Sequence, residues 1–408
     1  MPIRSPLHIV FAGGGSAGRL YPGLAVATQL KERLPDVAIT FVGGGKPIER
    51  HPVRAAGFNY VTIPSQPVPR NPFLAMRFIT DNVAGYWASR WYLKEHRASL
   101  VVGLGGYASA ATVRAATSRG IPTVLLEQNA VPSHVTRWLA RSADMVCAGF
   151  DDVRAHFAPN TPLVVTGNAA RPAFERMFRQ QEAGSREQGA GSKVTDQCLL
   201  PAPCRGTHEV GRLPASRERR LVVIGGADGS RTINEFMPRA LRALGDRLRG
   251  WQVVHQTGEG QLQQTIDRYR EAGVEALTVS FIDEMAPVMF ASDLVVCRAG
   301  GTTLAELALA GVPAVLVPYP RDVEAYQLAN ADVVAAAGAA TVIDESSLEE
   351  PLDEALAEQL APLLTDESRR EPMAENMRLL ARPDAAALIT DTIRIILGAS
   401  VGTIRLAA

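Results

Sequence analysis

This sequence of 408 residues has few cysteines, few aromatic residues and no net charge, and it lacks the patterns of several classes of protein. Its four cysteines are scattered without the paired spacing of a zinc site, so neither a metal centre nor a disulfide framework is indicated. No apolar run approaches the roughly 20 residues of a membrane-spanning helix, and the apolar stretch 7–12 is too short for a signal peptide. The chain has no Asp-X-Asp triplet, so a carboxylate-bound metal is not indicated either. We therefore expect a globular cytoplasmic protein.

The residues that are present suit a chain with two hydrophobic cores. Hydrophobic residues make up 47% and charged residues 21% of the sequence, and the length is sufficient for two domains of ordinary size. The charge is unevenly distributed, because residues 1–176 hold 19 Lys and Arg against 10 Asp and Glu. A basic first half favours an anionic partner such as a phosphate, a nucleic acid or an anionic membrane. Chance variation along the surface is the alternative.

Short β-branched runs alternate with helix-like segments in both halves, which predicts two doubly wound α/β domains. The predicted strands are 7–12, 37–42, 100–102, 123–126 and 145–147 in the first half, and 221–224, 252–255, 277–280, 294–297 and 314–317 in the second. Residues 177–218 are rich in Gly, Ser, Arg, Glu and Pro and predict an insertion or linker. The expected organisation is a first domain over 1–176, that linker, a second domain over 219–384, and a C-terminal helix over 385–408 that packs back on the first domain.

Four glycine-rich turns follow predicted strands, at 13–18, 103–107, 225–230 and 300–303, and we call them the first to fourth glycine loops. Glycine lets the backbone approach a ligand closely, and the helix that follows each turn presents free N–H groups to a phosphate. Doubly wound folds bind ligands at such loops. The first glycine loop resembles a dinucleotide fingerprint, but no acidic residue ends the second predicted strand. A dehydrogenase is therefore disfavoured.

Short motifs follow one another along the chain, and their order is more specific than any one of them. They are 13–22 (GGGSAGRLYP), 105–109 (GGYAS), 127–132 (EQNAVP), 167–171 (GNAAR), 225–229 (GGADG), 281–285 (FIDEM), 297–300 (CRAG), Thr303, Glu306 and 327–331 (QLANA). Together they resemble the MurG family of glycosyltransferases over nearly the whole chain. The resemblance implies a GT-B fold, in which two Rossmann-like domains with parallel sheets face one another across a cleft.

The resemblance also implies an activity. The family makes an inverting transfer of GlcNAc from UDP-GlcNAc to the 4-hydroxyl of MurNAc in undecaprenyl-diphosphate-MurNAc-pentapeptide, which converts lipid I to lipid II in peptidoglycan synthesis. The donor is bound mainly by the second domain. No cofactor is required, and assistance by magnesium stays open. A UDP-sugar transferase with another acceptor, or a non-catalytic UDP-sugar-binding paralogue, remain as alternatives.

Residue by residue, the resemblance implies that Glu306 accepts hydrogen bonds from the donor ribose, that the Ile282 backbone pairs with uracil, and that Gln327 binds the sugar hydroxyls. Asn129 either contacts substrate or, as a buried residue, caps a helix. The substrate-binding positions are Gly15, Ser16, Ala17, Gly18, Asn129, Arg171, Ala227, Ile282, Gly301, Thr302, Thr303, Leu304, Ala305, Glu306 and Gln327.

The sequence departs from the family pattern where a general base is expected. Arg19 stands at the family's histidine, and arginine cannot take a proton at any working pH. Ala227 replaces a serine that contacts donor phosphate. Arg19, Glu127 and Asn129 are the candidate catalytic residues, and two explanations stay open: catalysis with another base, such as Glu127 or a water, or a paralogue of altered activity.

Residues 71–97 mix aromatic and basic side chains, which suits peripheral binding to an anionic membrane. The family is expected at the cytoplasmic face of the plasma membrane because its acceptor is a polyprenyl diphosphate; no nucleic-acid partner is expected. Packing of these aromatic residues in the core is the alternative. The predicted acceptor and membrane residues are Phe73, Phe78, Trp87, Trp91, Gly105, Gly106 and Tyr107.

Overall fold

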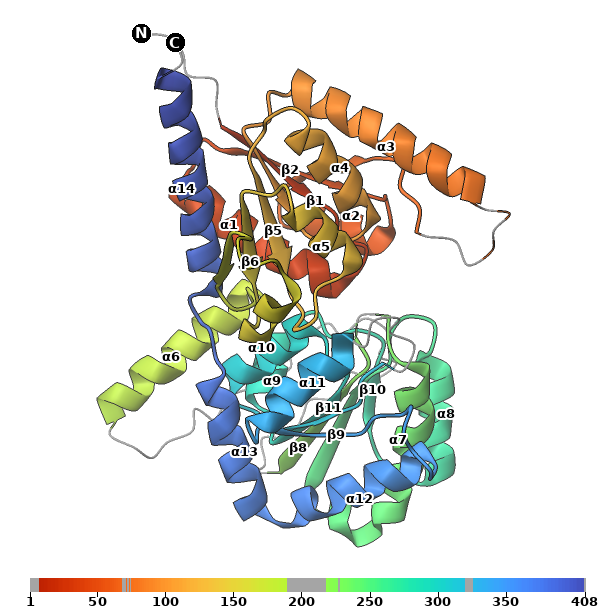
Figure 1. The fold of residues 1–408 in the computed structure, drawn as a ribbon. Helices are drawn as coiled ribbons and strands as arrows, with labels where there is room; N and C mark the ends of the chain where they lie inside the picture. Colours follow the sequence, from red (N-terminus) through yellow and green to blue (C-terminus); the bar gives the residue numbers. More distant parts are fainter. Residues whose placement is uncertain are drawn as a thin grey trace. The chain divides into compact units, whose positions relative to one another are not determined.

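The computed structural model describes residues 7–67, 71, 73, 75–188, 218–226, 228–319 and 326–406. The chain forms two compact units, each built around one parallel sheet (Figure 1). Unit 1 comprises Met1–Arg171 and Arg382–Ala408, and unit 2 comprises Pro172–Ala381. Two Rossmann-like α/β units confirm the predicted fold class, while the predicted cleft between the sheets stays a prediction.

Unit 1 contains a seven-stranded sheet in the order β3-β2-β1-β4-β5-β6-β7. In that order the strands are β3 (Asn59–Thr62), β2 (Ala38–Gly43), β1 (His8–Ala12), β4 (Leu100–Gly103), β5 (Thr123–Glu127), β6 (Met145–Ala148) and β7 (Leu163–Val165). The connecting helices are α1 (Ala17–Arg33), α2 (Pro47–Ala55), α3 (Ala75–Glu95), α4 (Tyr107–Thr117), α5 (His134–Ala140) and the short 3-10 helix η2 (Asp151–His156). The order reverses between β1 and β4, and doubly wound sheets bind ligands at that point.

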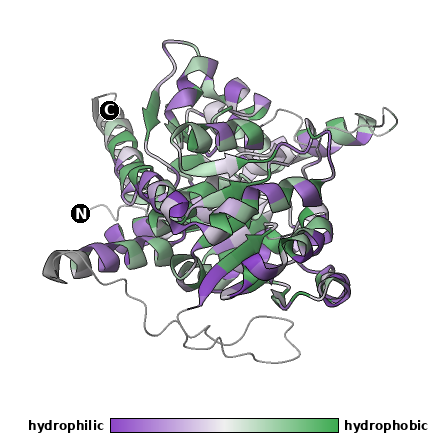
Figure 2. Ribbon diagram, turned by 90° about the horizontal axis from the view of Figure 1, so that it is seen from below, coloured by the Kyte–Doolittle hydropathy of each residue, from purple (hydrophilic) through white to green (hydrophobic). Residues whose placement is uncertain are grey.

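The central strands are apolar throughout because both faces of this sheet are covered. Side chains alternate across a strand, so Ile9 and Phe11 of β1 enter one core while Val10 and Ala12 enter the other. Phe11 stacks on Phe41 of β2, with ring centroids 5.0 Å apart. Figure 2 shows the strands largely in the hydrophobic colour, between helices that carry hydrophilic outer turns. A continuous apolar run therefore predicts a central strand here.

The C-terminal helix α14 (Ala385–Leu406) belongs to unit 1, although the chain reaches it only after passing through unit 2. Its residues Ala386, Ile389 and Ile393 enter the same core as Ile9. Their spacing puts them on one face of a helix. Arg33 at the end of α1 and Asp391 form an exposed ion pair of 2.7 Å.

Helix α6 (Pro172–Gln188) begins directly after the first segment of unit 1. It crosses the predicted domain boundary at residue 176 and extends into the predicted linker. It lies within unit 2, where the rings of Phe174 and Phe290 are 6.1 Å apart. The remaining linker residues 189–217 lie outside the described residues.

Unit 2 repeats the architecture with a six-stranded parallel sheet in the order β10-β9-β8-β11-β12-β13. The strands are β10 (Leu277–Val279), β9 (Trp251–Gln256), β8 (Arg219–Ile224), β11 (Leu294–Cys297), β12 (Ala314–Leu316) and β13 (Ala340–Val342). The helices are α7 (Arg231–Leu244), η3 (Gly245–Leu248), α8 (Leu262–Ala272), α9 (Met285–Phe290), α10 (Gly301–Ala310), α11 (Tyr326–Ala336), α12 (Leu352–Thr365) and α13 (Glu367–Leu379). Among the described residues, no helix combines the length and apolar character needed to cross a membrane.

A buried polar chain lies beneath the third glycine loop in unit 2. The fully buried His255 of β9 bonds through Nδ1 to Tyr269 Oη at 2.8 Å and through Nε2 to Asn234 Oδ1 at 3.0 Å. Asn234 Nδ2 donates to Thr257 O at 2.8 Å, so its Oδ1 is left to accept a hydrogen bond from the Nε2–H of His255. These contacts fix the neutral tautomer, and burial lowers the pKa of His255 to about 3.

We expect His255 to make unit 2 sensitive to acid. The folded pKa lies below the ordinary value of 6.5, so the stabilisation is fully present above pH 6.5 and is lost as the pH falls toward about 3. The loss is about 1.4 kcal/mol per pH unit in that window. Urea unfolding between pH 7 and pH 4 should show a steeper fall in stability for the wild type than for His255→Gln. The control is His51→Gln at an exposed position, which should behave as the wild type; parallel pH profiles for all three proteins would refute the assignment.

Candidate functional site

The third glycine loop links β8 to α7 and is held against the end of β9. Gly229 has φ +75°, and a Cβ on it would lie 1.8 Å from the carbonyl oxygen of Thr257. Gly258 has φ +83°, and a Cβ added to it would lie 2.4 Å from Asp228 O. Each position therefore requires glycine both for its backbone angle and for the space beside it. Ala227, a predicted phosphate contact in this loop, lies outside the described residues.

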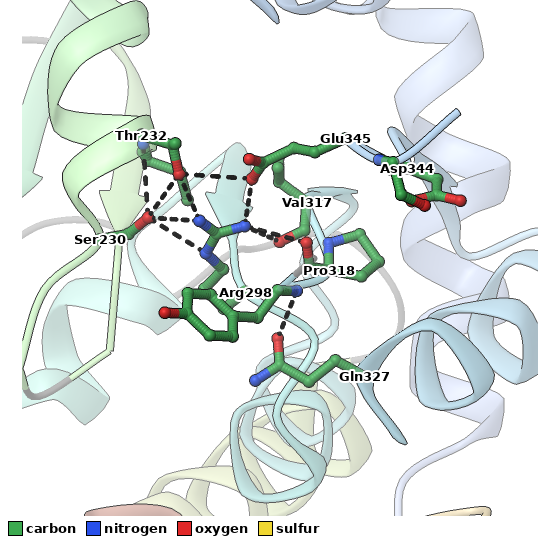
Figure 3. Close-up of polar contacts among 11 residues, drawn as sticks. Ser230, Thr232, Arg298, Val317, Pro318, Gln327, Asp344 and Glu345 are labelled. Atoms are coloured by element: carbon green, nitrogen blue, oxygen red, sulfur yellow. Dashed lines mark hydrogen bonds and ion pairs between the residues drawn. The ribbon is translucent and has the colours of Figure 1, made fainter. Parts of the chain in front are cut away.

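Arg298, directly after β11, ties the strand ends of unit 2 together (Figure 3). Its Nη2 donates to Ser230 Oγ at 2.6 Å and to Thr232 Oγ1 at 2.5 Å in the third glycine loop and α7. Its Nη1 donates to the carbonyls of Val317 and Pro318, both at 2.9 Å, after β12. The same nitrogen pairs with Glu345, which follows β13.

The Arg298 side chain is 8% exposed and that of Glu345 is 10% exposed. A guanidinium supplies five donors in a fixed plane, and here they meet partners from three loops. Arg298 therefore ties these loops together, and its polar atoms are engaged within the protein.

The fourth glycine loop leads into α10, whose N-cap Gly300 provides no side-chain hydrogen bond. The N-terminus of a helix carries the positive end of its dipole, which suits a phosphate. The predicted residues Gly301, Thr302, Thr303, Leu304 and Ala305 form this first part of α10. Glu306 follows on the same helix and is only 3% exposed. The structure thus gathers six predicted donor-site residues on one helix.

Two other predicted donor contacts have part of their polar groups engaged within unit 2. The Ile282 N–H donates to Gln256 Oε1 at 2.9 Å, so its carbonyl is the group that it can offer to a nucleobase. Gln327 of α11 accepts from the Tyr319 N–H at 3.0 Å through Oε1 (Figure 3). This bond orients the side-chain amide, whose NH₂ group can donate to a sugar hydroxyl.

In unit 1 the first and second glycine loops are in direct contact. Gly13 has φ +107°, and a Cβ on it would lie 2.2 Å from Gly105 O. The Gly13 N–H donates to Val42 O at 2.8 Å, and the Gly14 N–H to Gly105 O at 3.4 Å. Ser16 is the N-cap of α1, and Ala17 and Gly18 begin that helix. Gly106, with φ +83°, is the N-cap of α4, which begins at Tyr107.

Arg19 of α1 lies against the second glycine loop. A Cβ on Gly105 would be 3.5 Å from Arg19 Cδ, and one on Gly106 would be 3.6 Å from Arg19 Nη1. The guanidinium therefore stands at the N-terminus of α4, where two sources of positive potential add. Arg171 also lies in unit 1, with its guanidinium carbon 5.3 Å from the ring centroid of Tyr21.

Glu127 ends β5 and is 3% exposed. Its Oε1 accepts from the Asn129 N–H at 3.1 Å and from Asn129 Nδ2 at 2.9 Å. Burial raises the pKa of Glu127; hydrogen bonds from Thr136 and Asn129 and the charge of Arg19 oppose that rise. The three candidate catalytic residues thus form one cluster. The helix-cap alternative for Asn129 is wrong, because the N-cap of α5 is Ser133, which accepts from the Thr136 N–H at 3.0 Å.

The sequence analysis missed Glu49 of α2, which lies beside the first glycine loop and is 2% exposed. Its Oε1 accepts from the Gly15 N–H at 2.7 Å, and its Oε2 accepts from Tyr60 Oη at 2.5 Å and from the Gly45 N–H at 3.0 Å. A proline at the first helical position with a glutamate at the third marks a helix start in the sequence. Nothing local indicates the contact with Gly15.

Helix α3 presents an apolar face to solvent along most of its length. The exposed side chains are Phe73, just before the helix, and Met76, Ile79, Val83, Trp87 and Trp91. Core packing therefore does not account for Phe73, Trp87 and Trp91, which are 90%, 61% and 63% exposed. Phe78 is different, because its ring packs edge-on against Tyr107 at 6.4 Å.

Two further observations bear on ligands. Within the described ranges, no group of three or more His, Cys, Asp or Glu side chains is placed to hold a metal ion. A cavity of about 680 Å³ opens at the amino-terminal end of the first sheet, where His8, Thr40, Arg54, Tyr92 and His96 line it. None of the predicted site residues lines this cavity, and we assign the function to the glycine loops instead.

Comparisons with known proteins identify the family of this chain. Residues 9–148 match the Glycosyltransferase family 28 N-terminal domain, and residues 220–389 match the Glycosyltransferase family 28 C-terminal domain. A protein of Geobacter sulfurreducens is 35% identical over 94% of this chain and 97% of its own length. It is named UDP-N-acetylglucosamine--N-acetylmuramyl-(pentapeptide) pyrophosphoryl-undecaprenol N-acetylglucosamine transferase. The chain belongs to the MurG family.

Other MurG relatives give the same result. A protein of Nitratidesulfovibrio vulgaris with the same name is 35% identical over 96% of this chain and 97% of its own length. The crystal structure of Acinetobacter baumannii MurG superposes with a TM-score of 0.68, at 26% identity over 95% of this chain and 99% of that one. The predicted family, GT-B fold class and glycosyltransferase activity are thereby confirmed. The roles of individual site residues stay predictions.

Proposed function

We propose that this MurG-family enzyme transfers GlcNAc from UDP-GlcNAc to the 4-hydroxyl of MurNAc in undecaprenyl-diphosphate-MurNAc-pentapeptide, with inversion at the anomeric carbon. The observation that carries the proposal is the buried Glu306 on α10, whose N-terminus directly follows the fourth glycine loop. A carboxylate beside a helix N-terminus suits a nucleoside diphosphate, since it can accept from the ribose diol while the helix N–H groups donate to the phosphates. The near full-length match to MurG transferases supports this choice of donor.

In unit 2, the Ile282 carbonyl accepts from the uracil ring, and Gln327 donates to the hydroxyls of the sugar. The first turn of α10 holds the diphosphate together with the third glycine loop, which Arg298 fixes in place. These donors stabilise the charge that develops on the departing UDP. Transfer assayed with and without a chelator tests whether magnesium assists these donors.

In unit 1, Glu127 is the general base and Asn129 orients it. The 4-hydroxyl of MurNAc gives its proton to the Glu127 carboxylate as its oxygen bonds to the anomeric carbon. The bond from that carbon to the UDP phosphate oxygen breaks at the same time, and its electron pair leaves with UDP. Burial raises the pKa of Glu127, which makes its carboxylate a stronger proton acceptor than an ordinary glutamate. Arg19 serves as the cation for the acceptor diphosphate, at the N-terminus of α4.

The deciding experiment is transfer from UDP-GlcNAc to a synthetic lipid I analogue, with and without EDTA. Formation of the disaccharide product is expected, with Glu127→Gln abolishing it. If the wild type binds UDP-GlcNAc but makes no product, the protein is instead a non-catalytic UDP-sugar-binding protein. Tighter binding of TDP-sugars than of UDP-GlcNAc would refute the donor assignment.

We expect Glu306→Ala to weaken UDP-GlcNAc binding by about 1–3 kcal/mol, because the ribose hydroxyls then lose their buried acceptor. Titration calorimetry measures this difference directly. The matched control is Glu350→Ala, which removes an exposed carboxylate of unit 2 and should leave the affinity unchanged. Equal affinities for the wild type and Glu306→Ala would exclude Glu306 from the site.

The exposed face of α3 supports peripheral attachment to an anionic membrane at the cytoplasmic surface. Trp87 and Trp91 follow Val83 at spacings of four residues, so the apolar side chains form one stripe along the helix. Arg77 and Arg90 lie on the same helix and can attract anionic headgroups. The second glycine loop adjoins this helix through the contact between Phe78 and Tyr107, which suits a substrate with a polyprenyl chain.

Sedimentation with vesicles containing anionic phospholipid tests this attachment. Each indole withdrawn from the bilayer forfeits about 1.5 kcal/mol or more of transfer free energy, so Trp87→Ser/Trp91→Ser should lose about 3 kcal/mol and bind at least about a hundredfold more weakly. Leu379→Ser is the control, since it removes an apolar side chain of unit 2 that is 77% exposed. Equal vesicle binding by the wild type and the double variant would refute the membrane face.

A further inference from the structure

Glu49 stands where a ligand anion would be expected beside the first glycine loop. Three backbone N–H groups from two separate loops, those of Gly15, Gly45 and Lys46, point to its carboxylate at 2.7, 3.0 and 3.2 Å. The Tyr60 phenol adds a fourth donor at 2.5 Å. Converging backbone N–H groups of this kind form the anion sites of phosphate-binding loops. Here the anion belongs to the chain itself.

The surroundings of the carboxylate are built to hold it. A Cβ on Gly43, at the end of β2, would lie 2.4 Å from Tyr60 Oη and 2.9 Å from Glu49 Oε2. The paired acid and phenol thus fill the space above that strand end. A carboxylate offers about four acceptor sites, and four donors meet it. Burial, together with the hydrogen bond to Glu49, raises the pKa of Tyr60 above its usual range, so the phenol remains a donor.

This arrangement also explains why unit 1 differs from a dinucleotide-binding domain. An acidic group does lie near the end of β2, but both of its oxygens accept hydrogen bonds from within the chain. It is therefore not presented to a ribose, and the Gly15 N–H is not presented to a phosphate. The Gly15 N–H is engaged by Glu49, while the prediction that Gly15 contacts substrate stays a prediction.

We propose that Glu49 is a positioning residue for the acceptor side of the reaction, acting as an internal anion that preorganises the first glycine loop and the start of α1. The loop runs from Gly15 through the N-cap Ser16 to Arg19 in the first turn. The Arg19 side chain lies against Gly105 and Gly106, so a shift of the loop moves the guanidinium away from the N-terminus of α4. This role rests on the proposed function, because the group to be positioned is the one that receives the acceptor diphosphate.

Three variants separate a positioning role from simple structural support. Glu49→Gln keeps the shape but turns an NH₂ group toward backbone N–H donors, so kcat/KM for the lipid-linked acceptor should fall by about tenfold to a hundredfold, as for a small misplacement of a reacting group. The UDP-GlcNAc affinity of unit 2 should stay within about twofold, a difference that is small on the scale of binding free energies. Tyr60→Phe removes one donor only and should have a smaller effect. Glu32→Ala, at an exposed position on α1, is the control and should match the wild type.

Chemical rescue provides the decisive readout. Glu49→Ala leaves the N–H groups in place without their anion, so added formate or acetate should restore most of the lost activity, whereas chloride at equal ionic strength should not. If Glu49→Ala does not fold, Glu49→Gln and Tyr60→Phe still decide the question through the acceptor kcat/KM. Unchanged acceptor kinetics in Glu49→Gln, or a parallel loss of donor affinity, would overturn the proposal.

Failure of the proposed function is recognised separately. If the wild type makes no product from the lipid I analogue, the acceptor assignment fails, whatever Glu49 does. Hydrogen exchange then tests the internal anion alone. The amides of Gly15 and Gly45 should exchange faster in Glu49→Gln than in the wild type, and equal protection would refute the contact.

Discussion

Replacing Arg298 with methionine is expected to destabilise unit 2 by about 3–5 kcal/mol, the usual cost of removing one partner from a buried ion pair. The variant leaves the buried carboxylate of Glu345 without its cation and the carbonyls of Val317 and Pro318 without their donor. It also removes the donors that Arg298 directs to Ser230 Oγ in the third glycine loop. Urea unfolding should show the loss of stability, and calorimetry should show weaker UDP-GlcNAc binding under conditions where the variant remains folded.

Two control variants distinguish the loss of the Arg298 network from the loss of any positive charge. Arg249→Met removes an arginine that is 85% exposed and pairs with Asp246 at 3.3 Å; an exposed pair of this kind contributes little, so the stability should be unchanged. The double variant Arg298→Met/Glu345→Leu removes both buried charges and should recover part of the loss. A single variant as stable as the wild type would show that Arg298 does not hold the loops.

Gly229→Ala is expected to destabilise unit 2 by roughly 2–6 kcal/mol, from backbone strain and overpacking together. The left-handed φ of +75° disfavours any side chain, and the new Cβ would meet Thr257 O at 1.8 Å. The loop must therefore move away from β9, which takes its N–H groups away from the proposed diphosphate site. Thermal unfolding and UDP-GlcNAc affinity should both fall.

Gly260→Ala is the matched control for this substitution. Gly260 has a similar φ of +82°, but a Cβ there would meet nothing within 4 Å. Its cost should be limited to about 1–2 kcal/mol, the price of a left-handed conformation for a residue with a side chain. If Gly229→Ala and Gly260→Ala lose the same stability, the close approach of Gly229 to Thr257 does not contribute to the loss.

The sequence predicted most of the strands because the central strands are buried on both faces. A run of consecutive apolar residues predicts such a strand whatever its neighbours are. Leu294–Cys297, with all four residues buried, is an example. The strands that escaped prediction are β3, β7 and β13. Each lies at or near the edge of its sheet, is three or four residues long and is partly exposed, so it carries no such run.

The aromatic residues of α3 show a different limit. Composition alone left open a membrane face or a packed core, and the structure shows that only part of the set is packed. Trp87 and Trp91 are exposed, whereas Phe78 packs against Tyr107. Only the packing of α3 on α4, where Ser89 Oγ and Thr112 Oγ1 are 3.0 Å apart, determines which face of the helix remains open.

By itself, the sequence determined the alternation of strands and helices, the four glycine loops and the order of motifs that places the chain in the MurG family. These features depend on residues close together in the chain, so the hydrophobic periodicity and the glycine content of the sequence are enough to predict them. The tertiary structure decided which distant groups meet: Arg298 with Ser230, 68 positions apart, Glu49 with Gly15, 34 positions apart, and α14 with α1. Such contacts arise because a parallel sheet brings the carboxyl ends of non-consecutive strands to one edge, and no local pattern specifies which side chains will converge there.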